Sequence, residues 1–192
     1  MALFRLTPSA RPPLVVAGDG LYLRAPQMSD HAAWAELRRR SRAFLEPWEP
    51  AWAEDELSPS AFARRVRRSA EEIEADQNYP LLIFRAADDA LLGGLTLGQI
   101  RRGVSQAGTF GYWIGAEHAR RGHMLAAVGA MLRFGFAQLR LNRIEAACLP
   151  ENAASIGLLT RAGFTREGLA RDYLCIAGAW RDHVLFARLA RD

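Results

Sequence analysis

The chain has no lysine, only two cysteines among its 192 residues, and no apolar run long enough for a membrane helix. Such a helix needs about 20 apolar residues, and the longest candidate here, Met124 to Phe136, is interrupted by Arg133. Two widely separated cysteines fit neither a disulfide scaffold nor a CxxC metal pattern. We therefore expect a soluble protein without a metal site, in which Cys148 and Cys175 are small buried side chains.

Charge of one sign does not dominate, because 25 arginines face 21 acidic residues for a net charge of +4. A nucleic-acid surface would need basic residues clustered with aromatic ones on one face. The arginines between Arg38 and Arg42 instead share their stretch with Glu36 and Glu46, and those from Arg64 to Arg68 are followed by four acidic residues. These patterns predict solvated helix faces with opposite charges in reach, and no direct nucleic-acid partner.

The length corresponds to about one domain of ordinary size. Prolines and polar residues break up the first sixteen positions, which argues against a secretory signal and favours the cytoplasm. We expect one domain over residues 1–192, with a core at 20–190 and a flexible or peripheral stretch at 1–13.

Hydrophobic periodicity and turn residues predict a mixed α/β order, ββ-α-α-βββ-α-β-α-ββ, with one β-α-β crossover. Two proline-containing motifs set the early boundaries. Pro47 and Pro50 predict an aromatic, acidic loop at Phe44–Trp52, whereas Ser58 and Pro59 predict the start of a helix that reaches Asp76. The expected strands are 14–16, 21–24, 79–85, 91–100, 109–114, 143–149, 164–169, 173–176 and 180–189, and the other helices begin near 29, 124 and 151.

The crossover begins with a loop suited to a phosphate group. Without lysine the chain has no Walker loop, and the stretch around Gly122 lacks the GxGxxG pattern of dinucleotide-binding folds. The sequence Arg120-Arg121-Gly122-His123-Met124-Leu125 nevertheless follows a strand and opens a helix. Unpaired backbone N–H groups and the positive end of the helix dipole favour an anion at such a position.

Four separated motifs occur in one order along the chain, each with its own characteristic residues. They are Phe44–Pro50 (FLEPWEP), Gly111–Gly115 (GYWIG) continuing to Gly122-His123-Met124, Pro150–Ser155 with Leu158-Leu159 and Gly163-Phe164, and Asp172–Leu174 with Gly178–Val184. With these motifs the chain resembles the GNAT superfamily of acetyl-CoA-dependent N-acetyltransferases, and within it the RimJ-type ribosomal-protein alanine N-acetyltransferases, over residues 20–190.

The resemblance implies a twisted, mostly antiparallel sheet that splays near its middle, flanked by the four predicted helices, and acetyl-CoA as co-substrate. In the family signature Q/R-x-x-G-x-G/A, the first and last places are here Ala119 and Met124, so Gly122 alone keeps the strict pattern. The splayed strand would pair with the pantetheine arm and point one N–H at the thioester oxygen. The implied coenzyme-binding residues are Trp113, Ile114, Arg120, Arg121, Gly122, His123, Met124, Leu125 and Asn152. Asn152 can also cap the helix that it precedes.

Proton transfer is less clearly assigned, because the tyrosine that many relatives carry seven positions after the asparagine is replaced by Leu159. RimL-like relatives use a serine and a glutamate, which match Ser155 and Asp172. We expect these two as catalytic residues; the alternatives are a surface position for Ser155 and a pairing of Asp172 with Arg171 or Arg181.

For the acceptor, the family resemblance implies a protein N-terminus, in particular the alanine of a ribosomal protein, with the enzyme as a monomer or homodimer. The acidic loop Glu46–Glu56 would attract a basic tail, with Trp48, Glu49 and Tyr112 as substrate-binding residues. A solvated loop with inward-packed tryptophans is the alternative interpretation, and the aromatic residues Tyr112, Trp113, Tyr173 and Trp180 are expected in the sheet core. The alternative functions are acetylation of a small amine, such as an antibiotic or polyamine, and a coenzyme sensor without turnover.

Overall fold

A computed structural model describes residues 14–192, so the expectation for residues 1–13 lies outside the described part. It contains one mixed sheet with the strand order β1-β2-β3-β4-β5-β6-β8-β7. Neighbouring strands are antiparallel except for the pair β5 and β6. The strands are β1 (Val15–Ala17), β2 (Leu21–Arg24), β3 (Tyr79–Arg85), β4 (Leu91–Arg101), β5 (Ala107–Ile114), β6 (Arg143–Cys148), β7 (Thr165–Ile176) and β8 (Ala179–Leu189).

Five α-helices flank the sheet in the described range, one more than expected: α1 (His31–Arg40), α2 (Arg42–Leu45), α3 (Pro59–Glu74), α4 (His123–Arg133) and α5 (Ala153–Arg161). The predicted caps are confirmed, since the Ser58 hydroxyl accepts the Ala61 N–H at 3.1 Å and the Asn152 side chain accepts the Ser155 N–H at 3.0 Å. None of the helices within residues 14–192 has the length and apolarity to cross a bilayer.

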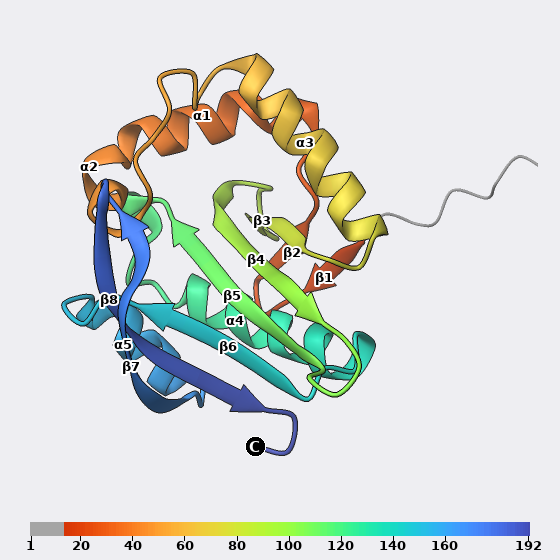
Figure 1. The fold of residues 1–192 in the computed structure, drawn as a ribbon. Helices are drawn as coiled ribbons and strands as arrows, with labels where there is room; N and C mark the ends of the chain where they lie inside the picture. Colours follow the sequence, from red (N-terminus) through yellow and green to blue (C-terminus); the bar gives the residue numbers. More distant parts are fainter. Residues whose placement is uncertain (1–13) are drawn as a thin grey trace, which may run out of the picture.

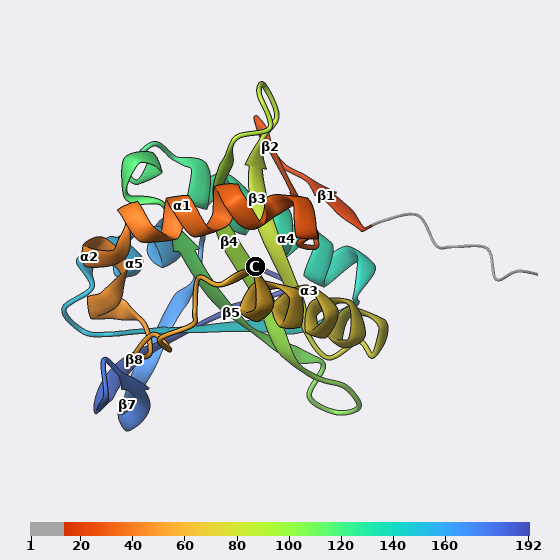
Figure 2. The same cartoon turned by 90° about the horizontal axis from the view of Figure 1, so that it is seen from above.

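The helices lie on both faces of the sheet (Figures 1 and 2). Alternating side chains of β3 show the division, because successive strand residues point to opposite faces. Leu82 and Phe84 pack with Trp34 of α1 and Phe62 of α3, whereas Leu81 and Ile83 belong to the larger core beneath α4 and α5. The expected mixed α/β fold is confirmed.

The expected loop at Phe44–Trp52 is partly helical, which corrects the prediction. Helix α2 runs directly into a 3₁₀ turn at Glu46–Trp48. Pro47 lies in the first turn of that short helix, where its missing N–H removes no hydrogen bond. The long apolar helix also differs from expectation, since α4 ends at Arg133 and continues as a π-helix over Phe134–Gln138.

The last two strands form a long hairpin that extends from the body of the protein (Figure 2). The two strands expected at 164–169 and 173–176 are one continuous strand, β7, with an irregular register between Ala170 and Leu174. Because the helices do not cover the end of this hairpin near its turn, Tyr173 and Trp180 are 43% and 65% exposed and Cys175 is exposed as well. The prediction that these three side chains are buried is wrong, whereas that for Cys148 is confirmed.

Strands β5 and β6 separate before they end (Figure 1). Their parallel pairing runs from Ala107 opposite Arg143 to Phe110 opposite Ala146. Beyond that point, residues 111–114 of β5 pair with β4 alone, and residues 147–148 of β6 pair with β8 alone. The sheet is therefore splayed, as the sequence resemblance implied.

Replacing Phe62 with alanine tests whether the α1/α3 layer stabilises the fold. The ring is fully buried between Trp34 and the sheet. We expect the Phe62→Ala variant to lose about 3–5 kcal/mol of unfolding free energy, measured by urea denaturation, because a large apolar side chain is removed and a cavity remains. Phe44→Ala is the matched control: Phe44 is 42% exposed, and its removal should change stability by less than about 1 kcal/mol. Equal losses in the two variants would contradict this packing.

Candidate active site

The gap between β5 and β6 forms the centre of the site. Residues 111–114 of β5 present one row of backbone groups to this gap without a strand partner. Two glycines on the neighbouring strand leave the space that Trp113 occupies, because a Cβ at Gly93 would lie 2.3 Å from its carbonyl oxygen and one at Gly94 would lie 2.6 Å from its indole nitrogen. Trp113 and Ile114, both expected to bind the coenzyme, thus lie on this free edge.

The loop before α4 adopts a conformation suited to binding an anion. Arg120 and Gly122 have positive φ angles of 60° and 82°, and Gly122 is the N-cap of α4. No side chain in the described range caps this helix end, so its first N–H groups remain available to a ligand. Arg120 and Arg121 are exposed and form no ion pair with another residue of 14–192.

Met124, the bulky residue at the last place of the family signature, does not obstruct the loop. Its side chain is buried and belongs to the core beneath the sheet. A groove of about 370 Å³ begins at the loop and continues along α4, lined by Asp19, Gly122, Leu125, Ala126, Gly129 and Arg133.

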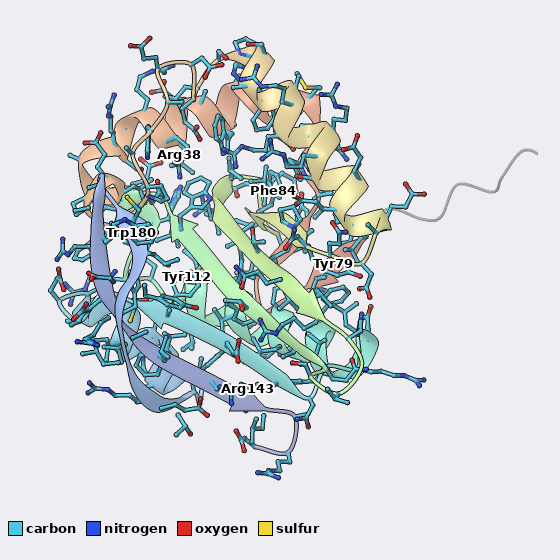
Figure 3. All side chains as sticks on the ribbon, in the orientation of Figure 1. Arg38, Tyr79, Phe84, Tyr112, Arg143 and Trp180 are labelled. Atoms are coloured by element: carbon cyan, nitrogen blue, oxygen red, sulfur yellow. The ribbon has the colours of Figure 1, made fainter. Side chains whose placement is uncertain are left out.

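Ser155 and Asn152 lie on the other side of the gap, at the start of α5. Asn152 caps this helix through its side-chain oxygen, so its amide NH₂ group can still contact a ligand. The Ser155 hydroxyl is 2.5 Å from the hydroxyl of Tyr112 on β5. Figure 3 shows Tyr112 beside the gap. Ser155 is 9% exposed, so it does not occupy the surface position that was the alternative.

Burial changes the acid–base properties of this group of side chains. It raises the pKa of the Tyr112 phenol above its ordinary value, while the hydrogen bond with Ser155 opposes the rise. Burial likewise raises the pKa of the neighbouring Cys148 thiol, again against a hydrogen bond with Ser155. Both groups therefore stay protonated at neutral pH.

An ion pair holds the loop that was expected to receive the acceptor. Arg38 of α1 donates two hydrogen bonds of 2.8 Å to the Glu49 carboxylate, to which the Trp52 indole N–H donates a third of 2.9 Å. The guanidinium also lies 4.3 Å from the Trp52 ring and 5.0 Å from the Trp113 ring. The Glu49 backbone oxygen accepts the N–H of Ala177 at the turn of the β7–β8 hairpin.

The acidic loop carries less free negative charge than the sequence predicted. Glu46, Asp55 and Glu56 form ion pairs with arginines of α2 and α3. Glu49 is occupied by Arg38, and Trp52 packs inward as the alternative interpretation had it. Trp48, the other tryptophan of this loop, is 37% exposed.

Asp172 lies in the irregular part of β7 with a positive φ of 45°. Its backbone N–H donates to Asp182, while its carboxylate forms no hydrogen bond or ion pair with another residue of 14–192. Arg181, one of the two partners named in the alternative interpretation, pairs with Glu151 instead. The structure thus brings Ser155 and Tyr112 together but does not connect Asp172 to them, and its catalytic role stays a prediction.

Sequence reasoning missed Arg38 as a residue of the site. It stands in a run of arginines with exposed neighbours, which made a solvated helix face the natural interpretation. Arg38 is four residues after Trp34, so both lie on the side of the helix whose apolar stripe faces the sheet. This spacing is the signal that could have identified Arg38.

Comparisons with known proteins agree with this arrangement. The acetyltransferase (GNAT) domain family matches residues 20–165. A probable N-acetyltransferase of Bacillus subtilis, YjcK, is 34% identical over 93% of this chain and 98% of its own. The [ribosomal protein uS5]-alanine N-acetyltransferase of Escherichia coli is 33% identical over 94% of this chain and 93% of its own.

Comparisons with solved structures indicate the same family. Mycobacterium smegmatis RimJ in complex with CoA-disulfide superposes with a TM-score of 0.85 at 34% identity, covering 94% of this chain and 87% of that one. A ribosomal-protein-S5-alanine acetyltransferase from Vibrio fischeri reaches the same TM-score at 28% identity, over 93% of this chain and 98% of that one. The chain belongs to the acetyltransferase (GNAT) domain family and is an acetyl-CoA-dependent N-acetyltransferase.

Proposed function

We propose that this enzyme acetylates the N-terminal amine of a protein, with the N-terminal alanine of a ribosomal protein as its acceptor. The observation that carries the proposal is the similarity to the E. coli uS5-alanine enzyme along 94% of the chain, including both walls of the gap. Such an acceptor would also place the enzyme in the cytoplasm, where ribosomes are assembled.

The free edge of β5 and the loop before α4 would hold acetyl-CoA. In this arrangement the diphosphate lies at Arg120–Leu125, where main-chain N–H groups and the helix dipole favour negative charge. The pantetheine arm takes the place of a neighbouring strand along residues 111–114 and contacts Asn152. One N–H of that edge then donates to the thioester oxygen, on which negative charge develops during acyl transfer.

The side chains at the centre of the gap fit an N-terminal amine better than a lysine as the acceptor. Deprotonating an α-amine with a pKa near 8 costs about 1.4 kcal/mol at pH 7, whereas a lysine with a pKa near 10.4 costs about 4.6 kcal/mol. The groups at the centre of the gap, Tyr112, Ser155 and Cys148, are protonated and provide no strong base. Holding an already partly neutral amine beside the thioester can supply much of the rate enhancement.

A panel of acceptors tests this function. Purified enzyme is mixed with acetyl-CoA and ribosomal-protein peptides that begin with alanine or serine, and release of free CoA thiol is measured. We expect the alanine peptide to give the highest kcat/KM, by up to about a hundredfold over serine, because the two differ by one hydroxyl. The same alanine peptide with a blocked N-terminus and an internal lysine should not be acetylated.

Two other outcomes of this acceptor panel would indicate a different function. Faster turnover of a polyamine or an aminoglycoside would replace the proposal with a small-molecule acceptor. Binding of acetyl-CoA in calorimetry without thiol release from any amine would indicate a coenzyme sensor.

Replacing Gly122 with glutamate tests the coenzyme loop. The new carboxylate would repel the diphosphate, so we expect calorimetry to show at least about a hundredfold weaker binding of CoA. Gly103→Glu is the matched control, because Gly103 also has a positive φ, of 66°, and also has open space around its Cα. The control carries the same backbone strain in the distant turn between β4 and β5, and it should bind CoA normally. Normal binding by Gly122→Glu would place the diphosphate elsewhere.

Replacing Glu49 with glutamine tests whether the acidic loop takes part in binding the acceptor. The substitution leaves the buried Arg38 cation without its counter-charge, which should cost about 3 kcal/mol of stability. Because the Glu49 carboxylate joins Arg38 of α1 to the acidic loop, we expect KM for the peptide to rise while that for acetyl-CoA stays unchanged. Glu46→Gln is the control: its ion pair with Arg42 is exposed and should contribute less than about 1 kcal/mol. An unchanged peptide KM in Glu49→Gln would separate this ion pair from acceptor binding.

A further inference from the structure

Two hydroxyl groups from different elements meet at the point where the sheet opens. Tyr112 lies on the part of β5 that has already separated from β6, opposite Leu95 of β4. Ser155 lies in the first turn of α5, on the far side of the gap. Their oxygens are 2.5 Å apart, so a strong hydrogen bond bridges the gap where no strand pairing does.

Both members of the pair are held in place by the surrounding structure. The backbone N–H of Ser155 donates to Asn152, and Ser155 is almost fully buried. Tyr112 packs against the core that includes Cys148 and Leu159. A hydroxyl pair that is fixed in this way loses little conformational freedom when a substrate binds.

Either hydroxyl can donate in this hydrogen bond. In the arrangement in which Tyr112 donates to the Ser155 oxygen, the Ser155 proton is free for another acceptor. Hydrogen bonds in such a chain polarise and strengthen one another. The raised pKa of Tyr112 keeps the phenol protonated through the neutral range.

Leu159, at the position where the sequence resemblance suggested a tyrosine, cannot serve in proton transfer. Its side chain is fully buried in the core and carries no polar group. Acetyl transfer nevertheless requires that the departing sulfur gain a proton and that the attacking nitrogen lose one. Both atoms are bonded to the same tetrahedral carbon, so two adjacent hydroxyls suffice to connect them.

We propose that Tyr112 and Ser155 form a two-hydroxyl relay that carries the proton from the attacking amine to the departing CoA sulfur. As the C–N bond forms and the C–S bond breaks, Ser155 gives its proton to the sulfur and receives that of Tyr112, whose oxygen takes the proton lost by the nitrogen. Both hydroxyls end as they began. Tyr112 is then a catalytic residue instead of a substrate-binding one, within the function proposed above.

Steady-state kinetics of Tyr112→Phe, Ser155→Ala and the double variant test the relay. Each single change should lower kcat by about a hundredfold, which is the usual contribution of a proton-transfer group. The double variant should be no slower than the slower single variant, because both changes interrupt one relay. KM for the peptide and the Kd of acetyl-CoA should stay within about twofold, since neither hydroxyl is needed for binding.

Tyr79→Phe is the matched control. Tyr79 also packs in the core and also donates its hydroxyl to a neighbour, Asp76, at 2.7 Å. This variant removes an equivalent hydrogen bond away from the gap, so it should lower the melting temperature without lowering kcat. If Tyr112 had only a structural role, Tyr112→Phe would behave like Tyr79→Phe and lower the melting temperature without lowering kcat.

The relay and the proposed acceptor fail in different ways. A kcat of Tyr112→Phe near that of the unmodified enzyme, or losses that multiply in the double variant, would overturn the relay whichever amine is the acceptor. If the unmodified enzyme prefers a small amine, the proposed acceptor is wrong, and the same kcat ratios measured with that amine still decide the relay. If it acetylates no amine, both proposals are overturned.

Discussion

The early separation of β5 from β6 is the structural constraint on which the rest of the site depends. The hydrogen bonds of a parallel pair are evenly spaced along the strands, and the pairing of β5 with β6 stops after Phe110 and Ala146. The backbone groups of residues 111–114, beyond that point, face the gap without a strand partner on that side. A ligand with amide groups of its own can serve as that partner, which explains why an opened sheet is a binding site and not a defect.

Two polar contacts hold the elements around the opening where strand pairing no longer does. Tyr112 and Ser155 join β5 to α5 inside the gap. Arg38 and Glu49 join α1 to the acidic loop, and the backbone oxygen of Glu49 joins that loop to the hairpin turn. These contacts are local and directional, so each wall can be positioned without closing the gap.

Much of the fold was predictable from the sequence, because it depends on local signals. Strand alternation, the Ser58 and Asn152 caps and the crossover helix all appeared where the pattern predicted them. The hairpin was harder, since an alternating strand looks the same whether a helix covers it or not. Trp180 and Cys175 were therefore placed in the core, although they are exposed.

The site was less predictable because its contacts join residues that are far apart in sequence. Tyr112 and Ser155 lie 43 positions apart, and no local pattern links a strand residue with a helix residue at that distance. The charge of the acidic loop was misjudged for the same reason, since arginines of α2 and α3 neutralise three of its carboxylates. Sequence motifs identified which segments surround the gap, but not which side chains meet there.

The hydroxyl groups at the centre of the gap also affect which amine the enzyme can acetylate. A proton relay made of two neutral hydroxyls moves a proton without creating a lasting charge in the gap, where an isolated charge would be costly. The same relay cannot hold a proton, so it helps an amine that reaches the gap already neutral. An α-amine meets that condition far more often than a lysine near neutral pH. The proposed selectivity for protein N-termini can therefore arise from the chemistry at the centre of the gap, even where the acidic loop at its rim is largely neutralised.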